Sequence, residues 1–308
     1  MSNSEQRKIS VAITCYNSYD YIVDALRVPL IDPRVDEILI IDDASSEGEL
    51  EKAQDIFSSK TLIGDLYPDE HQSGGFSLHD LEGLIKEKVS AYANDKNKGA
   101  YITKTTAVSQ CKNEWVFLLD SDNYLLHSSI DALYSTDWLP DTCYYSALQI
   151  RVKEDGRSFY DPGLGFHGYT HLGDKPIDMD RFAEIVRKFD SLGTEDWGAG
   201  GLGSFLNQGN FFVNKQKYID TIASVQLRCD PLGFDAGAAM IAWMRRGNNI
   251  KVLPGLSYVH RMRSDSLYTS TGEESGHIST HMLANFMDHC CGCETINPAI
   301  IFKEDIEK

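Results

Sequence analysis

The sequence predicts an α/β protein in which helices flank a mostly parallel central sheet and a helical tail follows. Two short apolar runs rich in β-branched residues, 9–14 and 36–41, have the length and composition of buried strands. Residues at helical spacing follow each of them, and a third apolar run lies at 115–119. This alternation of strands and helices is typical of parallel sheets with helical crossovers.

The first half of the chain continues this pattern in order. After the first strand, Ile22, Ala25 and Leu26 share a helical face, and we expect Pro29 to end that helix. Ser45-Ser46-Glu47 opens a second helix after the second strand. The remaining expected elements are a turn-rich exposed segment over 64–78, a helix over 79–93 and a helix from Asn97 to about Cys111.

The second half is more varied. A strand-like stretch begins at 141 and becomes rich in Gly and Pro before 176. The later expected elements are a helix over 180–189, a Gly-rich loop over 193–204, a strand over 205–213, a helix over 233–246, a strand over 250–261 and a helix near 278–289. No internal repeat interrupts this order.

Composition and charge limit the classes of function. With 42% hydrophobic residues, the 308-residue chain has enough apolar side chains for a sizeable core. Its formal net charge of −17 argues against non-specific binding of nucleic acid or of anionic lipid, and favours cations wherever carboxylates cluster. Without an apolar run of about 18 residues or an apolar leader, we expect a soluble cytoplasmic protein with no transmembrane segment.

The seven cysteines do not have the spacing of a disulfide framework. Three of them, Cys290, Cys291 and Cys293, lie near His277, His281 and His289. A structural zinc site is one interpretation of this cluster, since two of the histidines are one helical turn apart. The spacing is irregular for zinc, however, so reduced cysteines that pack the tail are the favoured interpretation.

Carboxylates follow the predicted strands. Asp42 and Asp43 end the second strand, and Asp120 and Asp122 end the third clear one. Because the carboxyl ends of parallel strands share one crevice, we expect these groups to gather around an oxygen-ligated Mg²⁺ or Mn²⁺ that neutralises a diphosphate. The alternative is that such acidic pairs only form turns and cap helices.

Three segments, in order and with matching spacing, carry a resemblance to a known family. They are ISVAITCYNSYDYIVDAL, DEILIIDDAS and NKGAYITKTTAVSQCKNEWVFLLDSDN. Across residues 9–123, and more loosely to about 266, the chain resembles the family 2 glycosyltransferases of the GT-A fold. The resemblance implies a GT-A domain over 1–270, with a donor half at about 8–123, an acceptor half at about 124–270, and a C-terminal extension over 271–308.

The resemblance also implies roles at the donor site. Thr14, Tyr16 and Asn17 would contact the nucleotide, with Tyr16 stacked on the base unless it is a packed core aromatic. Asp42 or Asp43 would accept a hydrogen bond from the base, uracil being the commonest.

Further donor-side roles follow from the Asp-x-Asp region. Asn97 and Gly99 match the family's Asn-x-Gly. Lys104 stands in place of the usual Arg near the diphosphate, unless it lies on a solvated helix face, and Thr105 replaces an Asn. Asp120 and Asp122 would hold the metal, with Asp120 also at the donor.

The resemblance also implies a catalytic base in the second half of the chain. Gly233-Phe234-Asp235, then Arg246-Gly247, a strand and His260 reproduce the family's order, which points to Asp235 as base and His260 as a third metal or diphosphate ligand. By themselves, Asp235 would be an N-cap and His260 a core residue. The alternative base is Glu195 or Asp196, in the Thr-Glu-Asp triplet found in processive relatives.

Two features belong to the acceptor side. Gln208-Gly209-Asn210 lies where relatives shape the acceptor pocket, and Trp197 could stack on a sugar from a lid or belong to the core.

The expected function is metal-dependent, inverting transfer of a sugar from a nucleotide diphosphate donor, UDP-linked in the first instance, to a hydroxyl acceptor. The acceptor would be a glycan or a lipid-linked molecule in glycan or polysaccharide biosynthesis, with peripheral membrane contact left open. The alternatives are a sugar-nucleotide nucleotidyltransferase and a catalytically silent nucleotide- or carbohydrate-binding module.

Overall fold

The computed structural model describes residues 7–47, 49, 51, 78–153, 166–169, 172, 175–192, 205–290 and 300–302. Within them, one large sheet has the strand order β3-β2-β1-β4-β8-β6-β10-β5, with β7 paired to β6. Its strands are β1 (Ile9–Cys15), β2 (Val35–Asp42), β3 (Val89–Ala93), β4 (Trp115–Asp120), β5 (Tyr124–Leu125), β6 (Thr142–Lys153), β7 (Phe166–Gly168), β8 (Phe211–Asn214) and β10 (Asn249–Met262).

Strand direction divides this sheet into two parts. The β3, β2, β1 and β4 strands are all parallel, so their carboxyl ends lie along one edge. The β8 strand pairs antiparallel with both β4 and β6, and β10 again runs parallel to β6. The β6 and β10 strands therefore run in the same direction as β1 and β4, and their carboxyl ends lie at the same edge of the sheet.

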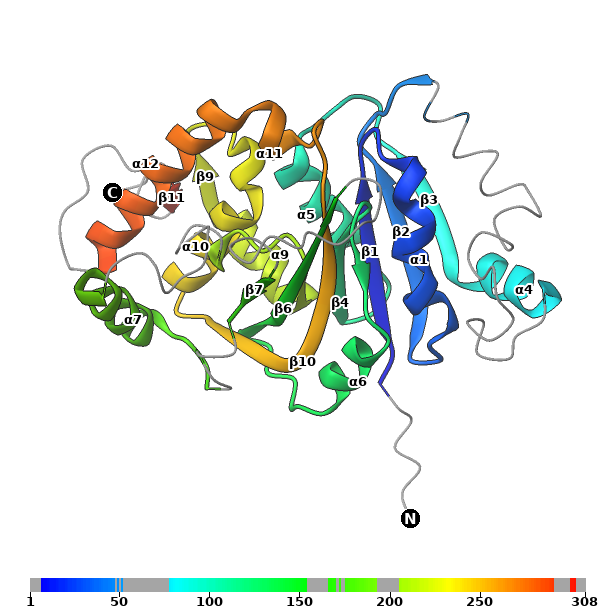
Figure 1. The fold of residues 1–308 in the computed structure, drawn as a ribbon, viewed down its shortest axis with the longest axis horizontal. Helices are drawn as coiled ribbons and strands as arrows, with labels where there is room; N and C mark the ends of the chain where they lie inside the picture. Colours follow the sequence, from blue (N-terminus) through cyan, green and yellow to red (C-terminus); the bar gives the residue numbers. More distant parts are fainter. Residues whose placement is uncertain are drawn as a thin grey trace, which may run out of the picture.

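Alternating side chains of the strands pack into two separate cores. Val11 and Ile13 contribute to one core, while Ala12 between them contributes to the other. The first core includes side chains of α1 (Ile22–Ile31), α4 (Leu78–Lys88) and α6 (Ser128–Tyr134). The second includes side chains of α5 (Ala100–Gln110), α7 (Met179–Leu192), α9 (Lys215–Ala223), α10 (Asp235–Arg245) and α12 (Gly272–Cys290). Figure 1 shows α10 and α12 on one side of the sheet and α1 on the other.

The predicted α/β class is thus confirmed, with some local differences. Pro29 lies inside α1 rather than ending it, because a proline so near the end of a helix removes only one backbone hydrogen bond and its neighbours Val28 and Leu30 are buried. Residues 89–93 form β3 rather than helix, because pairing with β2 supplies backbone partners that helical propensity does not predict. The strand expected over 205–213 begins only at Phe211, after a short helical turn.

The described residues beyond 270 pack against the rest of the protein. Met282 and Phe286 of α12 are buried in the second core, and the ring centroid of Phe286 lies 5.1 Å from that of Phe182 in α7. Near the end of the chain, β11 (Ile300–Phe302) pairs antiparallel with β9 (Val225–Leu227). The division of the chain at residue 270 stays a prediction. Across the described residues, no helix is both long and apolar enough to cross a bilayer.

We predict that α12 contributes to global stability. Replacing Phe286→Ala removes a buried ring and should lower the free energy of unfolding by about 3 kcal/mol. The control Ile102→Ala changes a side chain on α5 that is 47% exposed, so its effect should stay within about 0.5 kcal/mol. Urea unfolding followed by circular dichroism measures both, and equal effects of the two substitutions would contradict the packing of α12.

Candidate active site

A cavity of about 980 Å³ opens at the carboxyl ends of β1 and β4, where open α/β sheets bind ligands. It is also lined from β6, β10, α5 and the start of α10. Eleven of the predicted site residues line it: Thr14, Tyr16, Asn17, Asp43, Asn97, Gly99, Lys104, Asp120, Asp122, Asp235 and His260. Asp42 is not among the lining residues, and Glu195, Asp196 and Trp197 lie outside the described residues.

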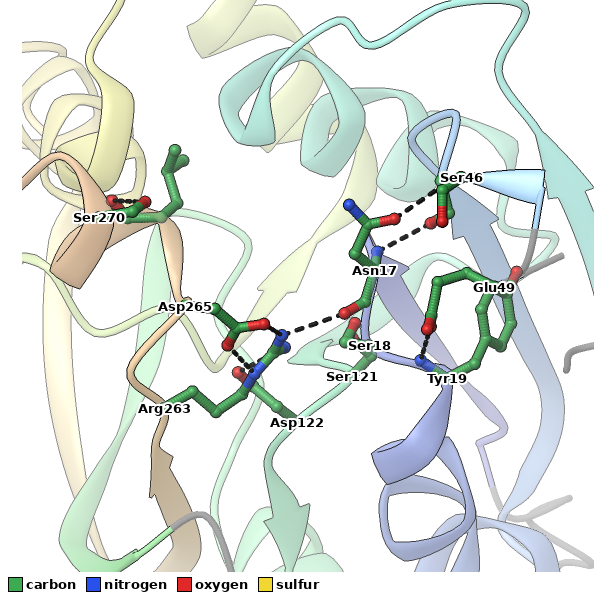
Figure 2. Close-up of polar contacts among 12 residues, drawn as sticks. Asn17, Ser18, Tyr19, Ser46, Glu49, Ser121, Asp122, Arg263, Asp265 and Ser270 are labelled. Atoms are coloured by element: carbon green, nitrogen blue, oxygen red, sulfur yellow. Dashed lines mark hydrogen bonds and ion pairs between the residues drawn. The ribbon is translucent and has the colours of Figure 1, made fainter.

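The loop after β1 is held in shape by Asn17. Its backbone is in the left-handed region (φ 48°), its N–H donates to Ser45 Oγ (2.8 Å), and its side-chain oxygen accepts from Ser46 N–H (2.9 Å). Figure 2 shows these contacts. Tyr16, next to it, is 50% exposed and lines the cavity, so it is not a core aromatic. Asn17 thus fixes the loop that presents the Tyr16 ring.

The structure separates Asp42 from Asp43. Asp42 accepts hydrogen bonds from the backbone N–H and the hydroxyl of Ser45, which makes it a turn-forming residue. Asp43 instead reaches the loop before α5, where Lys98 N–H and Gly99 N–H each donate to its carboxylate at 2.9 Å. Gly99 has a φ of 81°, a conformation that favours glycine. Of the two carboxylates, only Asp43 lies at the cavity.

Lys104 connects the end of β4 to the start of α10 through two ion pairs. Its Nζ lies 2.9 Å from Asp120 Oδ1 at the end of β4 and 2.8 Å from Asp235 Oδ2 at the start of α10. The residue is only 5% exposed, so Lys104 does not lie on a solvated helix face. Burial alone would lower the pKa of Lys104, but attraction to the two carboxylates outweighs burial and holds the pKa above its usual value.

The backbone of Gly209 closes a third side of this ion-pair group. A Cβ at Gly209 would lie 2.2 Å from Asp120 Oδ2 and 3.3 Å from Lys104 Nζ. The next residue, Asn210, accepts a hydrogen bond from Asp120 N–H (2.8 Å) and is almost fully buried. The segment expected to shape the acceptor pocket therefore also holds the Asp120 carboxylate in place.

Asp122 and Arg263 form a second charged contact. Arg263 Nη1 lies 3.6 Å from Asp122 Oδ2, while the same guanidinium donates to Asp265 and to the Asn17 carbonyl. Figure 2 shows the Arg263 side chain between these groups. Burial, and then repulsion from Asp120, raise the pKa of Asp122 to about 6, against a partial offset from Arg263. The positive charge of Arg263 therefore only partly compensates the negative charge of Asp122.

The proposed metal ligands do not form a ready-made cluster. Within the described ranges, no three His, Cys, Asp or Glu side chains are grouped as a metal site, Asp120, Asp122 and His260 included. Their joint role in metal binding stays a prediction. His277 and His281 lie one turn apart on α12, while Cys291 and Cys293 lie outside the described residues, so the tail cluster also stays open.

Sequence reasoning missed Arg263 and the positional role of Gly209. Both are far along the chain from the Asp120–Asp122 segment, and neither stands in a recognisable motif. The one available signal for Gly209 is a glycine inside the segment expected to form a strand, 205–213, which often marks a close approach of backbone to another group.

Gly209 should not tolerate a side chain. We predict that Gly209→Ala lowers the free energy of unfolding by roughly 1–3 kcal/mol, because the new methyl group overlaps the Asp120 carboxylate. The matched control is Gly83→Ala, where nothing lies within 4 Å of the new atom inside helix α4, and alanine should stabilise by roughly 0.5–1 kcal/mol. Urea unfolding of both variants measures these changes. A Gly209→Ala variant as stable as wild type would contradict the close approach of the Gly209 backbone to the Asp120 carboxylate.

Asp122 should make stability depend on pH. Because its pKa in the folded protein is about 6, above the ordinary 3.8, protonation favours the folded state. Stability associated with this group is complete below pH 3.8 and is lost as the pH rises through 6. We therefore expect Asp122→Asn to be more stable than wild type at pH 7.5, by roughly 1–3 kcal/mol at about 1.4 kcal/mol per pKa unit.

The gain from Asp122→Asn should largely disappear near pH 4, where the wild-type carboxyl is protonated. Urea unfolding at the two pH values measures it, with Asp220→Asn as control because Asp220 is an exposed residue of α9. A gain of the same size at both pH values would show that charge is not its cause.

Comparison with known proteins supports the fold. No family model and no curated protein sequence matches the chain. Among solved structures, S. aureus TarS 1-349 in complex with UDP-GlcNAc is 13% identical, with a TM-score of 0.51 over 91% of this chain and 66% of the TarS chain. GalNAc-T7 with UDP, GalNAc and Mn²⁺ is 14% identical, with a TM-score of 0.52 over 94% of this chain and 50% of that one.

A third structure is the mannosyltransferase PcManGT from Pyrobaculum calidifontis in complex with GDP-Man and Mn²⁺. It is 12% identical, with a TM-score of 0.50 over 96% of this chain and 67% of its own. The chain thus spans about half to two thirds of the length of these proteins. At such low identity, the likeness establishes the fold: the chain has the GT-A fold of nucleotide-sugar glycosyltransferases, as its sequence resemblance implies.

Proposed function

We propose that the protein is a metal-dependent, inverting glycosyltransferase that moves a sugar from a nucleoside diphosphate donor to a hydroxyl acceptor. The observation that carries this proposal is the meeting of Asp120 and Asp235 in one cavity at the sheet edge. A carboxylate at the end of a donor-side strand and a second carboxylate at the start of α10, which meets the first at Lys104, are the two groups that such a transfer needs. The structures with this fold that hold UDP-GlcNAc or GDP-Man support a sugar nucleotide as donor.

The donor nucleotide would lie on the side of the cavity that is formed by the loop after β1 and the loop before α5. Tyr16 exposes a ring on which a base can stack, and Asp43 lies nearby with its carboxylate ordered by the loop before α5. Thr14 and Asn17 from the β1 loop, with Asn97 and Gly99 from that second loop, complete this side. A UDP-sugar is the donor we favour, and family 2 is the sequence family whose motifs these residues match.

The carboxylates at the end of β4 suit Mg²⁺ or Mn²⁺. Asp120 and Asp122 both line the cavity and offer oxygen ligands, and burial together with repulsion between the two carboxylates raises the pKa of Asp122. His260, also in the wall, is the third proposed ligand to the metal or the diphosphate. A bound divalent cation would supply positive charge to the diphosphate leaving group. GalNAc-T7 and PcManGT are both described with Mn²⁺.

Asp235 is the proposed base. In the transfer, the Asp235 carboxylate accepts the proton of the acceptor hydroxyl while that oxygen forms a bond to the anomeric carbon. The bond from the anomeric carbon to the β-phosphate oxygen breaks, its electron pair leaves with the nucleoside diphosphate, and the proton passes from Asp235 to solvent. Attack opposite to the leaving group inverts the anomeric configuration. Glu195 and Asp196 remain alternative bases.

The acceptor and the cellular setting are proposed more broadly. A glycan or a lipid-linked molecule would reach the anomeric carbon from the β6 and β10 side of the cavity, where Gln149 and His260 offer polar groups to hydroxyls. Glycan or polysaccharide biosynthesis in the cytoplasm, with peripheral contact to a membrane where the acceptor is lipid-linked, is the proposed setting.

A donor screen tests the activity. We expect one class of sugar nucleotide, a UDP-sugar first, to release its nucleoside diphosphate when the protein and Mn²⁺ or Mg²⁺ are present, and the release to fall at least tenfold with EDTA. Coupled detection of UDP or GDP measures it across UDP-, GDP- and dTDP-sugars. Absence of release with every donor and with mixed hydroxyl acceptors would remove the proposal.

Asp235→Asn tests the base. The substitution keeps the shape of the side chain but removes the proton acceptor, so turnover should fall about 10²–10⁴-fold. The matched control, Asp220→Asn, changes an exposed residue on α9 and should leave turnover unchanged. If Asp235→Asn retains full activity in the same assay, the base must be another group, and Glu195 and Asp196 are the next residues to substitute.

A further inference from the structure

Lys104 forms close ion pairs with two carboxylates, Asp235 and Asp120. Its Nζ is 2.8 Å from Asp235 Oδ2 and 2.9 Å from Asp120 Oδ1, so one ammonium group serves both carboxylates. The side chain of Asp235 is 10% exposed and that of Lys104 is 7% exposed. These are charges held largely away from water, where their mutual orientation is strongly constrained.

The packing around the ammonium fixes its position. Lys104 projects from the middle of α5, and the Gly209 backbone approaches so closely that a Cβ there would be 3.3 Å from Nζ. Asp120 in turn is tied to Asn210 through its backbone N–H. Helix α5, the end of β4 and the turn before β8 therefore form a fixed frame, and Asp235 is attached to this frame through Lys104.

We propose that Lys104 is a positioning residue for Asp235: it fixes the direction of the Asp235 carboxylate and couples it to the donor-side carboxylate Asp120. This inference rests on the proposed function, and it differs from the direct contact with diphosphate that the family resemblance implies for this position. An ammonium flanked by two carboxylates orients both of them, because moving either one away leaves a buried charge without its partner.

The proposal makes a specific statement about energetic coupling. If Lys104 acts through Asp235, its removal should matter only while Asp235 is present. If Lys104 instead binds the diphosphate directly, its removal should weaken nucleotide binding and should lower turnover in any background.

The test is a double-mutant cycle of wild type, Lys104→Met, Asp235→Asn and the double variant. We expect Lys104→Met to lower kcat about 10²-fold while the KM for the donor and the Kd for UDP with Mn²⁺ change less than about threefold. In the Asp235→Asn background, Lys104→Met should lower kcat by less than about twofold. Lys104→Arg, which keeps the positive charge, should recover at least tenfold of the loss.

Controls separate this role from a loss of fold. Lys112→Met removes an exposed lysine just beyond α5 and should leave kcat unchanged. Circular dichroism and Tm report folding, and Lys104→Gln replaces Lys104→Met if the latter does not fold. An equal loss of kcat from Lys104→Met in the wild-type and Asp235→Asn backgrounds, or tenfold weaker binding of UDP, would overturn the proposal.

A separate readout distinguishes failure of this inference from failure of the proposed function. The same four proteins are compared in urea unfolding, which requires no substrate, and a non-additive effect on stability is expected for residues in contact. If wild type releases no nucleoside diphosphate from any donor, the function and the positioning role both fail, even where coupling in stability persists. If wild type is active but the cycle is additive in kcat, only the inference fails, whether or not coupling in stability persists.

Discussion

The buried ion-pair group of Asp120, Lys104 and Asp235 is the constraint on which the site depends. Burying the Lys104 ammonium and the Asp235 carboxylate costs several kcal/mol for each ion, and close opposite charges, including that of the partly exposed Asp120, offset that cost. The three residues come from β4, α5 and α10, so the charges are satisfied only if these elements keep their relative positions. The same contact therefore fixes the fold near the cavity and holds two carboxylates close together in its wall.

The surrounding backbone supports this group without adding charge. Gly209 lets the chain pass within contact distance of the Asp120 carboxylate, and Gly237 does the same for the Phe234 ring beside α10. Methyl groups at either position would overlap atoms that have no room to move away. Close backbone approach at these points is thus part of how the end of β4 and the start of α10 come to face each other.

The sequence was sufficient for the α/β class and for eleven of the residues that line the cavity, because both depend on local patterns. Apolar runs of strand length, each ending in Asp, predict where β2 and β4 end and hence which strand ends carry carboxylates. The sequence could not distinguish Asp42 from Asp43, since the choice depends on which carboxylate Ser45 and the loop before α5 bind. Nor could it predict that Lys104 contacts Asp235 or that Arg263 contacts Asp122, because these pairs depend on tertiary packing between distant segments.

The charges around the cavity explain why a cation should accompany an anionic donor. Among the described lining residues, six aspartates face four lysines and arginines, in a chain whose formal charge is already −17. Much of the positive charge is committed: Lys104 pairs with two of the aspartates, Arg261 with Asp24, and Arg263 with Asp265. A diphosphate that enters such a cavity meets excess negative charge, most directly at Asp122. A divalent cation bound by the carboxylates at the end of β4 would remove that repulsion, and it would do so without drawing Lys104 away from Asp235.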